Sequence, residues 1–287
     1  MWSLKGVGSV HSDSDGVSSG FTITEVLIVL AVTSLLFVST AVAINGQQAS
    51  TQFSQGMRDI ESKLRDVIND TATGYVPSNN QNYLCQVIGG VPRITAGSGA
   101  GLGTNDQCVV LGRAVQVNTT SDPSRIHIYT VIGRRTMPVA VGLSPTVPVA
   151  SLADANPVAA IDGVDLTETY ELRGGMRVLS ARTITRADSG MAGFFANFTN
   201  TTSGSTNDDG RVSALELPIP SSSTYQAANV ENCLQFQAPC DNIASLNLGE
   251  WSICFQRSDE RQTARLVVGD ATLKSPTAIR VEFEDCV

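Results

Sequence analysis

Histidine is nearly absent from this chain of 287 residues, which has two, and only His127 lies beyond the first twenty residues. A lone histidine in an alternating segment is interpreted as a structural or surface residue rather than as a catalytic base. No C-x-x-C pair occurs, which disfavours zinc. The glycine cluster at residues 97–103 fits neither G-x-G-x-x-G nor a P-loop, so it is interpreted as a loop. We therefore expect no metal and no cofactor.

Basic residues are also few: Lys and Arg number 19 against 27 Asp and Glu, a formal net charge of −8. Without a basic aromatic patch, this balance argues against general nucleic-acid binding. Glu282 and Glu284 share a strand face and are interpreted as exposed polar residues. Asp208-Asp209-Gly210 is interpreted as a solvated loop, because too few partners for calcium are visible. With no catalytic arrangement in view, we expect a protein that is not an enzyme.

What the chain does have is one long apolar run, residues 26–44, without a charge or a proline. As a helix this run is about 28 Å long and can cross a bilayer core. The segment before it is polar and carries Lys5 against Asp13 and Asp15, whereas a secretory signal places basic residues before its apolar part. The natural cut therefore lies before the helix. A signal-peptide cut near Ala43 is the alternative.

Glu25 stands at the head of this run. A carboxylate in or near hydrocarbon costs about 2.5–3.5 kcal/mol unless it is paired. Cleavage after Gly20 would create a cationic amine at Phe21, and in a bundle of staggered helices Glu25 of one subunit can meet the Phe21 amine of the next. The alternative is an interfacial glutamate that merely begins a transmembrane helix, where the helix dipole favours it.

Together, Gly20, Phe21, a threonine-rich turn, Glu25 and about twenty apolar residues resemble the start of the type IV pilin family, including the pseudopilins of type II secretion. The resemblance implies cleavage after Gly20 by a prepilin peptidase, N-methylation of Phe21 and assembly through Glu25. It also implies three further partners: other pilin subunits, a membrane assembly platform and, before assembly, the lipid bilayer.

A second, amphipathic helical segment follows the apolar run. Its apolar residues recur at spacings of three and four and should pack under the globular part of the chain. We expect the helix to end near Gly74. Gly46 is the weak point, with bending or local melting expected at residues 40–50. The apolar face comprises Phe53, Met57, Ile60, Leu64, Val67 and Ile68.

Residues 75–287 are rich in Val, Thr, Ser, Gly and Pro and contain no convincing second helix. Several segments alternate apolar and polar residues, which is typical of strands. The proline-rich stretch 136–158 is interpreted as an extended excursion or an edge. We predict an α+β fold, with a long N-terminal helix packed on a mainly antiparallel β-sheet head, pilin-like. The predicted strands are residues 108–117, 125–132, 170–179, 211–217, 251–256, 265–268 and 278–284.

An even number of cysteines, all after the apolar run, predicts disulfides formed outside the cytosol. Fifteen pairings are possible, of which the local ones join neighbours along the chain. The last of these resembles the C-terminal disulfide loop of many pilins. The local pairings are Cys85–Cys108, Cys233–Cys240 and Cys254–Cys286.

These observations predict four parts: a cleaved leader (1–20), a transmembrane or filament-core helix (21–45), the amphipathic half of the helix (46–74) and a disulfide-bonded head (75–287). The predicted function is a structural subunit of a type IV pilus or a related secretion or competence filament, and its length favours a minor or tip-associated subunit. A major subunit with an enlarged head remains open.

We expect a single-pass protein of the cytoplasmic membrane, with its head outside, that later joins a filament on the cell surface. Two other classes are considered: a membrane-tethered binding protein or adhesin that never polymerises, and a tethered hydrolase, which the absence of a catalytic arrangement disfavours. Glu25 discriminates among them, because polymerisation should need it and a monomeric tether should not.

Overall fold

The computed structural model describes the chain in two compact units, 1–48 and 49–287, each of which is considered by itself. One helix, α1, supplies residues to both units. The described residues are 20–74, 83–96, 107–140, 143–159, 166–196, 212–224, 227–234, 248–260, 262–270, 275–283 and 286.

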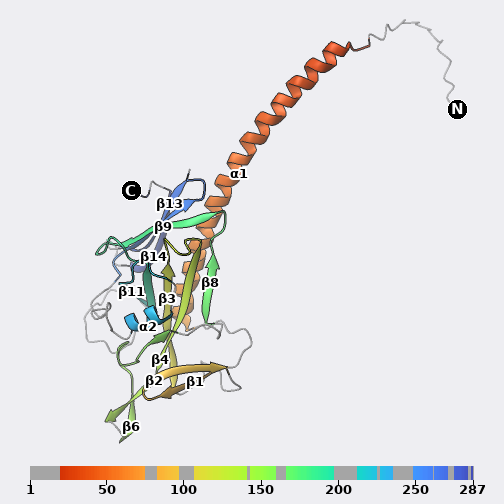
Figure 1. Cartoon of the computed structure of the whole chain (residues 1–287). Helices are drawn as coiled ribbons and strands as arrows, with labels where there is room; N and C mark the ends of the chain where they lie inside the picture. Colours follow the sequence, from red (N-terminus) through yellow and green to blue (C-terminus); the bar gives the residue numbers. More distant parts are fainter. Residues whose placement is uncertain are drawn as a thin grey trace, which may run out of the picture. The chain divides into compact units, whose positions relative to one another are not determined.

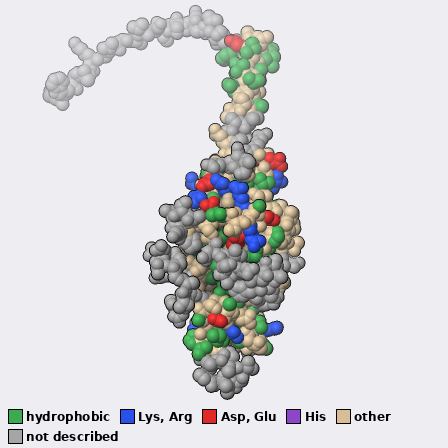
Figure 2. All heavy atoms as spheres, turned by 90° about the vertical axis from the view of Figure 1, so that its left-hand side faces the viewer, with side chains coloured by type: hydrophobic (Ala, Val, Ile, Leu, Met, Phe, Trp, Pro, Cys, Tyr) green, Lys and Arg blue, Asp and Glu red, His purple; other side chains and the backbone are tan. Residues whose placement is uncertain are grey.

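Helix α1 covers Ile23–Thr73. It ends where the sequence predicted, because Gly74 adopts φ +69° and its amide donates to Thr71 O at 3.3 Å. A glycine in this left-handed conformation is a common helix terminator. Within the first unit, Ile23–Ala41 is long and apolar enough to cross a membrane, and no part of it is buried. Figure 2 shows hydrophobic side chains covering this part of α1.

In the second unit, the apolar stripe of α1 forms the centre of the core. Phe53, Met57, Ile60, Leu64 and Val67 are each 1% exposed or less, which confirms the predicted face of the helix. They pack against strands of two large sheets, which are described below. Figure 1 shows this half of α1 running alongside β3 (Cys108–Val117), β4 (Arg125–Arg134) and β8 (Thr167–Glu171). The helical period of three and four residues therefore determines which side of α1 the head encloses.

Gly56 allows the helix to approach the strands closely. A Cβ atom at this position would lie 2.5 Å from Met176 Cε and 3.2 Å from the carbonyl oxygen of Arg173. Any larger side chain at this position would force the helix away from the backbone at Arg173. An ion pair also joins the helix to β8, because Lys63 Nζ lies 2.6 Å from Glu168 Oε1.

Arg113 of β3 and Asp70 of α1 form a second ion pair between the helix and a strand. Arg113 Nη2 lies 3.0 Å from Asp70 Oδ2, and the arginine side chain is 4% exposed. This nitrogen has no hydrogen-bond partner among the described residues, so the contact is an ion pair without a hydrogen bond. Loss of Asp70 would leave a buried charge uncompensated, which is strongly destabilising.

The larger sheet has six strands, all paired antiparallel, in the order β11-β10-β3-β4-β7, with β8 also paired to β4. It is buried on both faces: Phe194 of β10 faces the α1 core, whereas Phe195 faces a second cluster that includes Leu234 of α2. Helix α2 is Ala227–Leu234. The strands are β3 Cys108–Val117, β4 Arg125–Arg134, β7 Val158–Ala159, β8 Thr167–Glu171, β10 Met191–Ala196 and β11 Val212–Leu217.

The second large sheet has the order β14-β13-β12-β9, again antiparallel throughout. Its inner face contributes Trp251, Ile253, Phe255 and Leu266 to the α1 core. The indole Nε1 of Trp251 donates to Ser189 O at 2.9 Å, so its polar atom is satisfied in the interior. The strands are β9 Met176–Thr183, β12 Trp251–Arg257, β13 Thr263–Asp270 and β14 Ser275–Glu282.

Two hairpins complete the described fold: β1 Tyr83–Ile88 with β2 Val91–Ala96, and β5 Thr136–Ala140 with β6 Leu143–Pro148. Gly89 and Gly90 join β1 to β2 with φ values of +62° and +84°. Two successive positive φ angles are those of the tight turn that suits the twist of a hairpin. In Figure 1 the β1–β2 hairpin and the four-stranded sheet lie at opposite ends of this unit.

The structure is α+β, as predicted, with an N-terminal apolar helix and antiparallel sheets, but the strands form several sheets rather than one. Segments 108–117, 125–132, 211–217, 251–256, 265–268 and 278–284 were placed on strands correctly or within a few residues. The prediction of one strand over 170–179 was wrong. Gly174 and Gly175, at φ +69° and +66°, turn the chain between β8 and β9.

The proline-rich stretch 136–158, expected to be an extended excursion or an edge, contains the β5–β6 hairpin, whose two strands pair with each other in a sheet of their own. Two further elements differ from expectation. Strand β10 was not predicted, because MAGFFA has no alternation: both of its faces are buried. Helix α2, also unpredicted, has only eight residues, too few to show a helical period.

Replacing Leu64 by Ala tests the role of the helix as the core of the second unit. We expect a loss of about 2–5 kcal/mol in the free energy of unfolding, because Leu64 is 1% exposed and its removal leaves a cavity. Urea unfolding followed by the fluorescence of Trp251 measures the change. Ser62→Ala, two residues earlier on the exposed side, is the control and should change the free energy little. Equal effects of the two variants would contradict this packing.

Candidate functional site

The start of α1 is built as a reciprocal cap. The amide of Glu25 donates to Thr22 Oγ1 at 3.3 Å, and the amide of Thr22 donates to Glu25 Oε2 at 3.4 Å. The first helical bond follows, from Val26 N to Thr22 O at 3.2 Å. This is the capping-box arrangement of a threonine and a glutamate three residues later, which satisfies two amides that the helix leaves without partners.

The surface beyond this cap is apolar and open. Phe21 is 83% exposed and Leu35 74%. Glu25 is the one charged side chain between Gly20 and Arg58 in the sequence. A contiguous apolar surface of this size is normally covered by lipid or by another protein. Within the described chain, nothing covers it.

Three hydroxyl side chains in the apolar segment bond to their own helix. Thr33 Oγ1 donates to Val29 O at 2.8 Å, and Ser39 Oγ and Thr40 Oγ1 each donate to Leu36 O at 2.8 Å. Hydroxyls satisfied in this way do not need water. These three side chains can therefore lie in hydrocarbon or in a packed bundle of helices with their donors paired.

The Gly20–Phe21 peptide lies before the helix in exposed, non-helical backbone. A Cβ atom at Gly20 would meet no atom within 4 Å. The described structure thus gives no reason of packing for a glycine at this position.

The helix continues through Asn45 and Gly46. The backbone is helical throughout residues 40–50, so the expected local melting is not seen. The boundary between the two compact units nevertheless falls close by, between Gln48 and Ala49. Bending at Gly46 stays a prediction.

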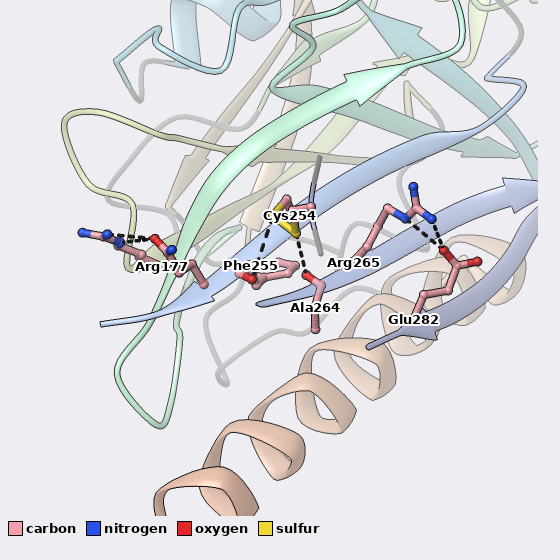
Figure 3. Close-up of a disulfide and its surroundings, with 8 residues drawn as sticks. Arg177, Cys254, Phe255, Ala264, Arg265 and Glu282 are labelled. Carbon is pink, nitrogen blue, oxygen red and sulfur yellow. Dashed lines mark hydrogen bonds and ion pairs between the residues drawn. A yellow bond between two sulfur atoms is a disulfide. The ribbon is translucent and has the colours of Figure 1, made fainter. Parts of the chain in front are cut away.

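The cysteines pair between neighbours along the chain. Cys85–Cys108 and Cys254–Cys286 are disulfides, and they are two of the three local pairings that the sequence left open. Cys233 is disulfide-bonded as well, and Cys240 lies outside the described residues. The Cys254–Cys286 bond joins the end of the chain to β12, and Cys286 Sγ lies 3.6 Å from Ala264 O on β13 (Figure 3).

Other residues considered from the sequence have structural surroundings. His127 lies on β4 beside Tyr129, with a ring-centroid distance of 6.3 Å, and its Nδ1 is 3.4 Å from Thr169 Oγ1. Asn118 opens a glycosylation sequon but is fully buried, and its Oδ1 accepts the amides of the following turn. The residues described contain no group of three side chains suited to a metal ion.

Glu282 forms ion pairs rather than an open carboxylate pair. Its carboxylate contacts Arg280 Nε at 2.8 Å and Arg265 Nη2 at 2.6 Å, and Figure 3 shows Arg265 and Glu282 reaching toward each other from adjacent strands. The hydrogen bond from Arg280 holds the pKa of Glu282 below its usual value, with Arg265 adding to the effect. Glu284, the glycine cluster at 97–103 and the loop at 208–210 lie outside the described residues.

Sequence reasoning missed a buried carboxylate. Glu216 is 2% exposed, and its carboxylate accepts hydrogen bonds from Thr183 Oγ1 at 2.8 Å and from Thr185 Oγ1 at 2.6 Å. Arg186 Nε lies 3.2 Å from Glu216 Oε1. The strand period was the available signal, because it places Glu216 on the same face of β11 as the buried Val212. Glu216 holds the turn after β9 in place.

The capping box was missed too, although T-x-x-E before an apolar run is its signature. Glu25 therefore has a local structural role in addition to any role between molecules.

Comparison of the chain with protein-family models, with curated proteins and with solved structures finds no match.

Thr22→Ala should loosen the start of α1. Loss of a capping hydroxyl costs about 1 kcal/mol, so amide hydrogen exchange over residues 23–26 should become about fivefold faster. The measurement is hydrogen exchange of the full chain in detergent micelles. Thr24→Ala is the matched control, because the Thr24 hydroxyl contacts only the side chain of Thr22. If both variants exchange at the same rate, the cap does not hold the helix start.

Proposed function

We propose that this chain is the precursor of a filament subunit, a prepilin of a type IV pilus or of a related secretion or competence filament. The observation that carries the proposal is an apolar, uncovered helical surface whose one charge, Glu25, lies at its head. A head with disulfides follows on the same helix, which suits an oxidising compartment outside the cytosol.

Processing after Gly20 accounts for two features that the fold does not explain. The Gly20–Phe21 peptide is exposed, so a peptidase can reach it. Gly20 has open space around it, so its identity is better explained by recognition from outside the chain. Cleavage there leaves a new amine on Phe21, one helical turn before Glu25. A chain amine has a pKa near 7.7–8.0, so it is largely cationic at neutral pH.

Assembly then pairs this amine with Glu25 of a neighbouring subunit. In the single chain, the capping bonds go to Glu25 Oε2 at 3.4 Å, so they are long. A carboxylate has acceptor positions on both oxygens. It can therefore take a charge-assisted bond from a second molecule while the cap persists. In an apolar bundle, either charge left alone would be costly, so pairing selects the correct stagger between subunits.

Before assembly, the helix resides in the cytoplasmic membrane with the leader inside and the head outside. Assembly moves it from lipid into the filament core, which replaces one apolar environment by another. The partners are those of a pilin: a prepilin peptidase, other pilin subunits and a membrane assembly platform. The size of the head favours a minor or tip-associated subunit.

Glu25→Leu tests the proposal in cells. The variant should stay at wild-type levels in membranes, but its amount in sheared surface filaments should fall at least tenfold. An unpaired Phe21 amine in the core costs about 2.5–3.5 kcal/mol for each subunit, well over a factor of ten. Quantitative immunoblotting of both fractions measures the change.

Glu25→Gln keeps an acceptor for the cap but removes the charge, so it should also be depleted from filaments. Glu61→Gln makes the same change in an i,i+4 surface pair with Arg65 and should assemble normally. Entry of Glu25→Leu into filaments at the wild-type level would contradict the proposal and favour a membrane-tethered protein that does not polymerise.

A further inference from the structure

A cleft of about 210 Å³ opens on the four-stranded sheet, beside the turn that follows β9. It lies in the second unit, far along the chain from Glu25, and it plays no part in the proposed assembly. Strands β9, β12 and β13 each contribute to its lining. The lining residues are Arg182, Thr183, Ile184, Glu250, Ser252 and Arg265.

Three of the lining residues are charged, and two of these form ion pairs, although Arg280, the partner of Glu250, also contacts Asp270 and Glu282. Arg265 Nη2 lies 2.6 Å from Glu282 Oε2, and Glu250 Oε2 lies 3.2 Å from Arg280 Nη2. Arg182 is exposed and has no carboxylate within ion-pair distance among the described residues. Arg182 is therefore the one arginine of the lining without a carboxylate partner among the described residues.

Arg182 differs in this respect from the other arginines of the sheet. Arg177, on the same strand, contacts Glu260 at 2.7 Å, and Arg257 of β12 is paired with Asp259. Figure 2 shows basic and acidic side chains intermixed on the face in view of this unit. Every other arginine on these four strands has its carboxylate, and a carboxylate from another molecule would complete the pattern at Arg182.

A hydroxyl accompanies the guanidinium. Ser252 is the direct cross-strand partner of Arg182 in the β9–β12 register, so both side chains lie on the same face of the sheet. Ser252 is 8% exposed and lines the cleft. A guanidinium can bind both oxygens of a carboxylate, and a serine hydroxyl beside it can donate to one of them.

The rim of the cleft is rigidly held. Glu216 accepts hydrogen bonds from Thr183 and Thr185 on either side of Ile184. Ile184 lies over Gly249, where an added Cβ atom would be 3.4 Å from Ile184 Cδ1. The geometry thus exists before a ligand arrives, which lowers the entropic cost of binding.

We propose that this cleft binds a carboxylate through Arg182 and Ser252. Two sources share this chemistry: an acidic side chain of a neighbouring protein chain and a small organic acid. The inference does not rest on the proposed filament function, because it uses the charges and register of the four-stranded sheet alone.

The test is a titration of the ¹⁵N-labelled full chain in non-ionic detergent at constant ionic strength, followed by the backbone amide resonance of Ser252. The probes are Ac-Gly-Glu-Gly-NH₂, the neutral Ac-Gly-Gln-Gly-NH₂ and sodium acetate. We expect a saturable shift with the glutamate peptide and with acetate and none with the glutamine peptide. Tighter binding of the peptide would indicate a protein side chain as the source, and equal binding a free acid.

Arg182→Gln should weaken binding of the glutamate peptide at least about tenfold, since a hydrogen-bonded charge is removed. Ser252→Ala should weaken it about threefold. Arg177→Gln removes the same charge from the same strand outside the cleft and should leave the affinity within about twofold. Equal shifts with the glutamate and glutamine peptides, or unchanged affinity in Arg182→Gln, would overturn the proposal.

Discussion

Burial of one stripe of α1 between two antiparallel sheets is the interaction on which the head depends. Phe53, Met57, Ile60, Leu64 and Val67 are enclosed by the six-stranded and the four-stranded sheet together. The apolar residues on the inner faces of both sheets pack against the same stripe of α1. Without the helix, neither sheet could bury its inner face. Gly56 and the Arg113–Asp70 pair then fix how closely the helix and the strands approach.

The same helix has an opposite character in its first half, and the contrast supports the functional proposal. There, the apolar residues have no partner in the described chain. The hydroxyls of Thr33, Ser39 and Thr40 bond to their own helix, so these three side chains need no water. Glu25 is the exception, a charge that caps its own helix and still has acceptor capacity. Lipid can cover the apolar surface, but it cannot satisfy this charge as a cation from a second subunit can.

Sequence patterns predicted what depends on a local period. The buried face of α1 follows a spacing of three and four, and β3 was predicted residue for residue. Sequence patterns failed to predict the elements whose structure depends on tertiary contacts. Strand β10 has both faces buried and so shows no alternation, and one apparent strand was broken by the turn at Gly174 and Gly175. In the candidate site, the roles of Gly20, Phe21 and Glu25 stay predictions that rest on the resemblance, whereas the cleft could be found only from the register that places Ser252 opposite Arg182.

Intact mass and N-terminal sequencing of the protein from membranes and from sheared surface filaments test the filament proposal most directly. The account predicts filaments that contain a chain beginning at N-methylated Phe21. An intact leader in every fraction, or a chain that begins just after Ala43, would contradict it and leave a tethered or secreted β-rich protein.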